Sequence, residues 1–255
     1  MLLNPLNGGL ATGLGSSYTR QRQFAAANYY YGRALAMTPR SVSARLTQAV
    51  AHLNLTGDLK GTQRLCPDVS ENIVPTGLED FLITLSDIVL LLSDQQQSKL
   101  LRLSPAVLDE DTVALALAKA FVYRRRGEFS LARASFDSAR AVLEKAVRCK
   151  ADDHLYHALF GLALAGLGRS AEATREGQRA IELLPVSKDA LDGALLPSSL
   201  ARIYVLLGDR ERAIDQLDSV FARPGPLSAN WLKVDPFWDP LRGNPRFQRL
   251  AGVRN

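Results

Sequence analysis

The fold is decided by residues 154–185, which read HLYHALFGLALAGLGRSAEATREGQRAIELLP. Gly168 separates two segments in which apolar residues recur every three or four positions, as they do on the buried face of an α-helix. Small residues at Gly161, Ala173 and Ala180 would let the two helices approach closely, because the distance between packed helices depends on the side chains at their contact. A proline ends the stretch, where it cannot continue a helix. The stretch therefore predicts a helix–turn–helix hairpin.

The same spacing recurs near the start of the chain. In both places a glycine, a bulky residue, two alanines and a proline are separated by 3, 9, 7 and 5 positions. The two sets are Gly161, Leu164, Ala173, Ala180 and Pro185, and Gly15, Tyr18, Ala27, Ala34 and Pro39. This pattern resembles the tetratricopeptide repeat (TPR), a helix–turn–helix unit of about 34 residues. The resemblance implies an all-α fold, an α–α superhelix in which successive hairpins stack into a right-handed solenoid with a concave side.

Repeats of this kind cover most of the chain. We expect a TPR-like solenoid of about six helix pairs over residues 1–223 and a proline-rich capping segment over residues 224–255. The helix pairs are expected at residues 8–40, 41–66, 78–104, 113–147, 154–187 and 194–223. Pro5 lies 34 positions before Pro39, at the place where a preceding repeat would close. We therefore expect the chain to be the C-terminal part of a longer protein; the alternative is a genuine start at Met1.

The capping segment combines aromatic residues with several prolines. Trp231, Phe237 and Trp238 would cover the exposed apolar face of the last repeat if the segment folded back over it. The segment resembles the closing segment of bacterial proteins in which a TPR array follows a serine/threonine kinase, a nucleotide cyclase or a DNA-binding domain. The shared motifs are Asp239-Pro240, Arg242-Gly243 and Pro245-Arg246-Phe247. The resemblance implies the C-terminal TPR array of a multidomain bacterial signalling protein.

Composition favours a folded protein that does not span a membrane. Hydrophobic residues make up 47% of the chain and charged residues 22%, a balance typical of a packed domain. No run of about 18 apolar residues occurs, so no transmembrane helix is expected. Cys66 and Cys149 lie far apart and outside any CxxC motif, which fits free thiols in a reducing compartment. We therefore expect a cytoplasmic protein with no membrane partner.

Residues that could support catalysis do not form a recognisable site. The chain lacks a glycine-rich phosphate-binding loop and the HRD and DFG motifs of protein kinases. Asp153, His154 and His157 could share one helix face, but no matching ligand from another helix completes a metal site. The acidic residues 109–111 precede an expected helix, where negative charge stabilises the helix start. We therefore expect no enzymatic activity, no cofactor and no metal.

The TPR resemblance implies that the first helix of each pair lines the concave groove. Matching the family's groove positions to this chain gives the candidate peptide-binding residues Ser16, Thr19, Arg20, Leu117, Phe121, Arg124, Arg125, Leu162 and Arg202. These side chains would form a groove edged by arginines with apolar patches, which suits an extended peptide that carries carboxylates. Arg124, Arg125 and Arg126 have a second interpretation, as a basic helix end favoured by the helix dipole.

We therefore expect a protein–protein interaction scaffold that holds a protein or peptide in its concave groove. Some TPR proteins bind chaperone C-terminal tails through a lysine- and asparagine-based carboxylate clamp, and the matching positions here lack those residues. One alternative is a helical-repeat module that binds RNA, since repeats of helix pairs about 35 residues long also read RNA. Residues 116–150 carry a net charge of +6 after a block of −5 at residues 76–115, a pattern more typical of solvated helix faces, so a nucleic-acid partner is not favoured. Another is the non-catalytic part of an enzyme whose catalytic domain lies upstream. The sequence predicts no oligomeric state.

Overall fold

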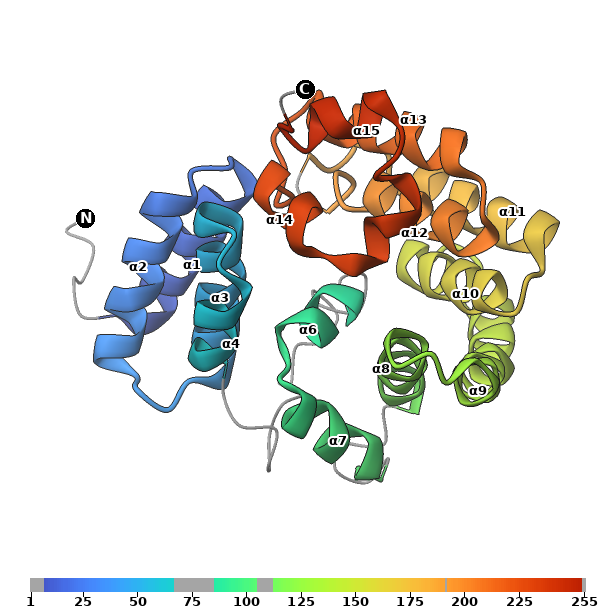
Figure 1. Cartoon of the computed structure of the whole chain (residues 1–255), viewed down its shortest axis with the longest axis horizontal. Coiled ribbons are helices and arrows are strands. Elements are labelled where there is room, and N and C mark those ends of the chain that lie inside the picture. The colour runs from blue at the N-terminus through green and yellow to red at the C-terminus, as the bar shows by residue number, and fades with distance from the viewer. Residues whose placement is uncertain (1–6, 67–84, 105–111, 191, 254–255) are drawn as a thin grey trace.

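The structure, a computed structural model, describes residues 7–66, 85–104, 112–190 and 192–253. All regular structure in these ranges is helical (Figure 1). The α-helices are α1 (Gly8–Arg20), α2 (Phe24–Met37), α3 (Val42–Thr56), α4 (Leu59–Leu65), α6 (Leu85–Leu91), α7 (Asp94–Arg102), α8 (Thr112–Arg125), α9 (Phe129–Cys149), α10 (His154–Gly166), α11 (Ser170–Leu183), α12 (Leu196–Leu207), α13 (Arg210–Phe221), α14 (Ala229–Val234) and α15 (Pro245–Leu250), and η2 (Pro236–Leu241) is a 3₁₀-helix. The expected all-α superhelix of helix pairs with a C-terminal capping segment is confirmed.

Successive helices pack as pairs. Helix α1 packs on α2, α3 on α4, α8 on α9, α10 on α11 and α12 on α13. The pair expected at residues 78–104 begins outside the described residues, and its described part forms α6 and α7. Pro5 and the acidic residues 109–111 also lie outside the described residues.

Small residues bring the helices together where the repeat pattern places them. Ala173 and Ala180 are 0% and 1% exposed. A Cβ atom added at Gly161 would lie 2.7 Å from the Ile203 Cδ1 atom and 3.1 Å from the Ala173 carbonyl oxygen. Such distances are shorter than a normal carbon contact, so α10 can lie this close to α11 and α12 because position 161 has no side chain.

The turn inside a helix pair has a left-handed backbone. Gly57, Gly127, Gly168 and Gly208 occupy the turns of α3–α4, α8–α9, α10–α11 and α12–α13, with φ of 70°, 76°, 79° and 78°. Glycine adopts this region without the steric penalty that a Cβ atom brings. Glycine at these four turns therefore has a conformational reason.

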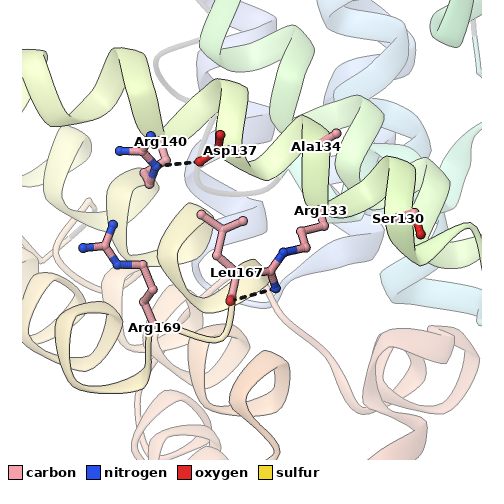
Figure 2. A pocket seen from close by; sticks show the side chains of 7 residues that line it. All are labelled: Ser130, Arg133, Ala134, Asp137, Arg140, Leu167 and Arg169. Atoms are coloured by element: carbon pink, nitrogen blue, oxygen red, sulfur yellow. Dashed lines mark hydrogen bonds and ion pairs between the residues drawn. The ribbon is translucent and has the colours of Figure 1, made fainter.

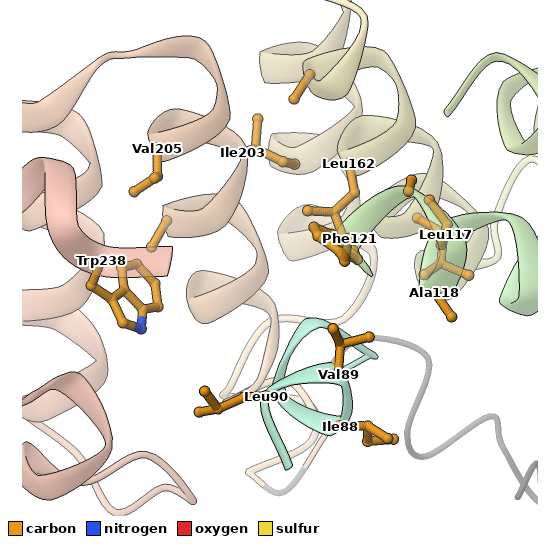
Figure 3. Packing of buried hydrophobic residues seen from close by; sticks show 14 of the residues in the cluster. Ile88, Val89, Leu90, Leu117, Ala118, Phe121, Leu162, Ile203, Val205 and Trp238 are labelled. Carbon is orange, nitrogen blue, oxygen red and sulfur yellow. The ribbon is translucent and has the colours of Figure 1, made fainter. Parts of the chain in front are cut away.

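The stacked pairs curve until the N-terminal helix pairs lie beside the capping segment (Figure 1). The N-terminal helices α1–α4 lie beside α14, and α6 lies towards the middle of the resulting ring. The capping segment folds onto α12 and α13 through η2 and α15, and buries Trp231 and Trp238 completely. One continuous cluster of buried apolar residues runs from α3 to the capping segment (Figure 3). The concave side is therefore not an open groove along its whole length, because the chain itself fills part of it.

None of the described helices combines the length and the apolar character that a membrane-spanning helix needs.

Candidate functional site

The candidate groove residues of the first repeat bind other parts of the chain. Thr19 is buried, and its hydroxyl oxygen lies 3.3 Å from that of Tyr31. The hydroxyl of Ser16 accepts a hydrogen bond from Tyr31 at 3.2 Å. Arg20 forms an ion pair with Asp192 at 3.3 Å, at the place where the first repeat meets the loop before α12. The structure therefore does not join these three residues with the candidates on α8 into one site.

Three further candidates lie in the core of the superhelix. Leu117, Leu162 and Arg202 are 0%, 1% and 1% exposed, because neighbouring helices and the capping segment cover this part of the concave face (Figure 3). The Arg202 guanidinium lies over the Trp238 ring, 5.2 Å from its centroid, and donates a hydrogen bond to the Ser198 hydroxyl at 2.6 Å. In this structure these side chains hold the superhelix together and are closed to a ligand.

The remaining candidates, Phe121, Arg124 and Arg125, line one cavity. It has a volume of about 210 Å³ and lies between α6, α8 and the start of η2. The complete lining consists of Val89, Leu90, Phe121, Arg124, Arg125, Asp235, Pro236, Phe237 and Pro240. We call this space the inner cavity. It is the place where the structure brings sequence-predicted site residues together.

The walls of the inner cavity are mainly apolar. Phe121 and Phe237 meet edge to face, with ring centroids 6.2 Å apart and an angle of 70° between the rings. Aromatic rings prefer this geometry, because the positive edge of one ring meets the negative face of the other. Val89 and Leu90 from α6 are almost fully buried beside α8 (Figure 3). A ligand group that enters would meet hydrocarbon on most sides.

Arg124 is the exceptional side chain of the inner cavity. Its guanidinium is half-buried and makes no hydrogen bond or ion pair with any residue that the structure describes. Burial lowers the pKa of Arg124, because the apolar surroundings disfavour its charge. An arginine nevertheless stays protonated in proteins, so the cavity contains a positive charge that forms no ion pair within the described ranges; the Asp235 side chain lines the same cavity. A bound carboxylate would supply a counter-ion.

Arg126, two residues further on, shows the contrast. Its guanidinium donates to the Asp94 carbonyl oxygen at 3.1 Å and to the Ser98 hydroxyl at 2.8 Å. The three arginines of the basic run therefore have different surroundings: Arg126 links α8 to α7, whereas Arg124 and Arg125 line the inner cavity. The interpretation of the run as a helix end favoured by the dipole does not account for the buried position of Arg124.

A second, larger pocket lies on the outer side of α9 (Figure 2). It has a volume of about 500 Å³ and is lined by Ser130, Arg133, Ala134, Asp137, Arg140, Leu167 and Arg169. Each of its arginines already has a partner. Arg140 binds Asp137 at 2.7 Å and Glu144 at 2.8 Å, Arg133 donates to the Leu167 carbonyl oxygen at 3.2 Å, and Arg169 binds a glutamate on its own helix turn at 2.7 Å.

The pKa shifts of the two arginine groups point in opposite directions. The hydrogen bond that Arg140 donates to Asp137 raises the pKa of Arg140, so local acids already stabilise that charge. Burial lowers the pKa of Arg124, where no acid compensates. Although the outer pocket is the larger, an added anion therefore has more to stabilise in the inner cavity, which is the better candidate site.

Sequence reasoning missed the wall that the capping segment contributes. Asp235 is 3% exposed and begins η2, where one carboxylate oxygen accepts a hydrogen bond from the Phe237 amide at 3.0 Å. Asp235, Pro236 and Phe237 face α8 across the inner cavity. The run of aromatic residues and prolines predicted a cap, but nothing local in the sequence indicates which helix the cap faces.

The histidines considered as metal ligands have other partners. His157 is buried, and its ring nitrogens lie 2.7 Å from a Glu176 carboxylate oxygen and 2.9 Å from the Ala151 carbonyl oxygen. The neighbouring Asp153 begins α10 and accepts a hydrogen bond from the Leu155 amide at 3.0 Å. In the described ranges no three histidine, cysteine, aspartate or glutamate side chains gather as a metal site would require. These residues therefore fix the start of α10 and its packing on α11.

Comparisons with known proteins find similarity among solved structures. No protein-family model and no curated protein matches the chain. Among solved structures, the TPR2AB domain of yeast Sti1 in complex with pHSP90 aligns over 96% of this chain and 98% of that one, at 13% sequence identity and a TM-score of 0.27. A similarity at this level carries no argument about fold or ligand, so both rest on the geometry above.

Proposed function

We propose that the chain is a protein–protein interaction scaffold whose inner cavity anchors a partner peptide. The anchored group combines a carboxylate with an aromatic or aliphatic side chain. The observation that carries this proposal is the half-buried guanidinium of Arg124, which has no hydrogen-bond or ion-pair partner among the described residues and lines a mainly apolar cavity. The resemblance of the capping segment to bacterial TPR arrays supports a place in the C-terminal regulatory region of a larger cytoplasmic signalling protein.

The size of the inner cavity favours a peptide anchor over a substrate or cofactor. Sites for small molecules usually have about 300–1,000 Å³. The inner cavity has about 210 Å³, which suits one large side chain or a chain end. A ligand of this kind would place one residue in the cavity and let the rest of its chain run along the surface.

The chemistry of the walls defines that residue. A carboxylate would pair with Arg124 in surroundings of low polarity, where hydrogen bonds to charged groups contribute about 1.5–3 kcal/mol. An aromatic or aliphatic group would contact Phe121 and Phe237. Loss of the carboxylate contact alone should therefore weaken binding by roughly 10- to 100-fold, because each 1.4 kcal/mol is a factor of ten.

Selection of peptides from a random display library on the full chain tests the proposal. We expect enriched peptides to carry an acidic residue or a free carboxyl end next to an aromatic or aliphatic residue. Arg124→Gln should weaken the selected peptides at least 10-fold while helicity is retained. Arg133→Gln is the matched control, since it removes one arginine from the outer pocket, and it should leave affinity unchanged.

Two results would contradict the proposal. If Arg124→Gln binds the selected peptides as tightly as the unaltered chain, the inner cavity is not the site. If single-stranded RNA binds the chain and its affinity falls steeply with salt, while no peptide is enriched, the positive charge serves nucleic acid instead.

A further inference from the structure

The first repeat departs from the other pairs at its turn. Arg22 stands in the α1–α2 turn at the position that glycine occupies in four other pairs, seven residues after Gly15, as Gly168 follows Gly161. Its φ is 57°, and no other described residue except glycine has a positive φ. A side chain in this region is strained, and strain of this kind is retained where the side chain has another use.

The side chain of Arg22 reaches the far end of the chain. Its guanidinium donates to the carbonyl oxygens of Val220 at 2.9 Å, Phe221 at 3.4 Å and Leu227 at 3.0 Å, and also to that of Arg223. It also lies over the Phe221 ring, 4.9 Å from the centroid. The last carbonyl groups of a helix have no partner within the helix and carry partial negative charge. Arg22 therefore caps the C-terminal end of α13, about 200 residues away in sequence.

A reciprocal contact runs the other way. Asn230 of α14 donates from its side-chain nitrogen to the carbonyl oxygens of Asn54 at 3.2 Å and Leu55 at 3.0 Å, at the C-terminal end of α3. Its side chain also lies against Gly57, the turn glycine of the second pair. The N-terminal repeats thus cap α13, and the capping segment caps α3. We call the contacts of Arg22 and Asn230 the ring closure.

The ring closure lies next to the wall of the inner cavity. Leu227, which accepts from Arg22, stands two residues before α14, and Asn230 stands inside it. Helix α14 has six residues, so it is about 9 Å long. Asp235 and Pro236 follow directly and line the inner cavity. A shift of α14 at the ring closure would therefore move this wall relative to α8.

We propose that Arg22 and Asn230 are positioning residues of the inner cavity. The ring closure holds α14, and through it the start of η2, at the distance from α8 that the peptide anchor requires. The inference rests on the proposed function, because it assigns to that site a dependence on the N-terminal repeats. The strained arginine in place of glycine is the observation that a role in packing alone does not explain.

The variant Arg22→Gly tests the positioning role of Arg22 separately from the folding of the first hairpin. It installs the residue that the other turns use, so the first hairpin keeps its turn while the contacts to α13 are lost. Hydrogen exchange reports the wall directly, and N-acetyl-L-phenylalanine serves as the probe of the cavity, since it joins a phenyl ring to a carboxylate. Its amide, which lacks the carboxylate, is the matched compound, and Arg33→Ala, an exposed arginine of α2, is the matched variant.

We expect exchange at the Phe237 and Trp238 amides to become at least 5-fold faster in Arg22→Gly, and the affinity for N-acetyl-L-phenylalanine to fall about 5-fold. Arg33→Ala should change neither value. Exchange that stays the same in Arg22→Gly overturns the inference, and so does tighter binding of the probe, since the ring closure would then restrict the cavity.

The proposed peptide ligand and the proposed positioning role can each be refuted without the other. If the unaltered chain does not bind the probe, or binds its amide equally well, the proposed ligand is wrong. The positioning role is then decided by hydrogen exchange alone, because the movement of η2 does not depend on which group enters the cavity.

Discussion

The capping segment meets the rest of the chain at two junctions of different chemistry. Towards α12 and α13, through η2 and α15, it buries Trp238, Leu241 and Phe247, each at most 1% exposed. The Trp238 indole nitrogen has no hydrogen-bond partner in the part of the chain that the structure describes, so apolar area dominates this junction. Towards α1–α4, helix α14 packs on α3 and carries the buried Trp231, and the ring closure adds polar contacts there.

The difference indicates that the junction with α12 and α13 keeps the capping segment folded, whereas the ring closure sets its position. Burial of a large apolar side chain contributes about 1.5–3 kcal/mol, so the three at α12 and α13 give roughly 4.5–9 kcal/mol as an upper limit. A hydrogen bond contributes about 0.5–1.5 kcal/mol net, or up to about 3 when one partner is charged. The ring closure can therefore open while the segment stays folded on α12 and α13.

Trp238→Ala should have the largest effect, because it attacks the apolar junction. Removal of a fully buried aromatic side chain costs about 3–5 kcal/mol, and this one also supports the stacked Arg202. Chemical denaturation monitored by circular dichroism measures the loss, with Trp238→Phe as the control that retains most of the buried area. A loss below about 1 kcal/mol would mean that the segment is not fixed by this junction.

Substitution of Arg22 should have an intermediate effect that depends on the new residue. Arg22→Ala loses the cap on α13 but keeps a Cβ atom in the left-handed region, so we expect a loss of about 2–3 kcal/mol. Arg22→Gly loses the same contacts and relieves the strain, so its loss should be smaller by about 1 kcal/mol. Denaturation curves of the two variants decide this. Equal losses would show that the turn is not strained in the folded chain.

The repeats could be predicted because their information is local. Gly161, Ala173 and Ala180 recur at fixed intervals, and the helices they join follow one another in sequence. The alignment to first helices also named Phe121 and Arg124, which line the same cavity because the face of a helix follows from its period; their role in binding stays a prediction. The repeat pattern alone therefore predicts the helix pairs and which residues share one face of a helix.

The rest depended on contacts between distant parts of the chain. Leu117 and Leu162 were expected in the groove but are fully buried, and no local pattern in the sequence indicates that the chain covers them. Arg22 and Asn230 each bind residues about 175–205 positions away, so their partners follow from the curvature of the whole superhelix. One signal was available: an arginine where the other turns have glycine.

Asn230→Ala should have a smaller effect and reveal the coupling within the ring closure. Loss of its two hydrogen bonds to the end of α3 should cost about 1 kcal/mol. The double variant Asn230→Ala with Arg22→Gly should lose about 0.5–1 kcal/mol less stability than the sum of the two single losses, because either change alone loosens the same junction. Glu144→Gln on α9, away from the ring closure, is the control: its loss of stability should add fully to that of Arg22→Gly. Full additivity of Asn230→Ala and Arg22→Gly would mean two independent contacts.

Arg20→Gln should have the smallest effect. The ion pair of Arg20 with Asp192 is partly exposed, with side chains 30% and 45% accessible, and such pairs contribute about 0–1 kcal/mol because water screens them. We expect a change within about 0.5 kcal/mol and unaltered binding of N-acetyl-L-phenylalanine, since Arg20 does not line the inner cavity. A longer selected peptide tests whether the ligand also reaches Arg20. If Arg20→Gln weakens a selected peptide but not the small probe, the peptide extends from the inner cavity to the first repeat, and the ring closure forms part of the groove that the TPR resemblance implies.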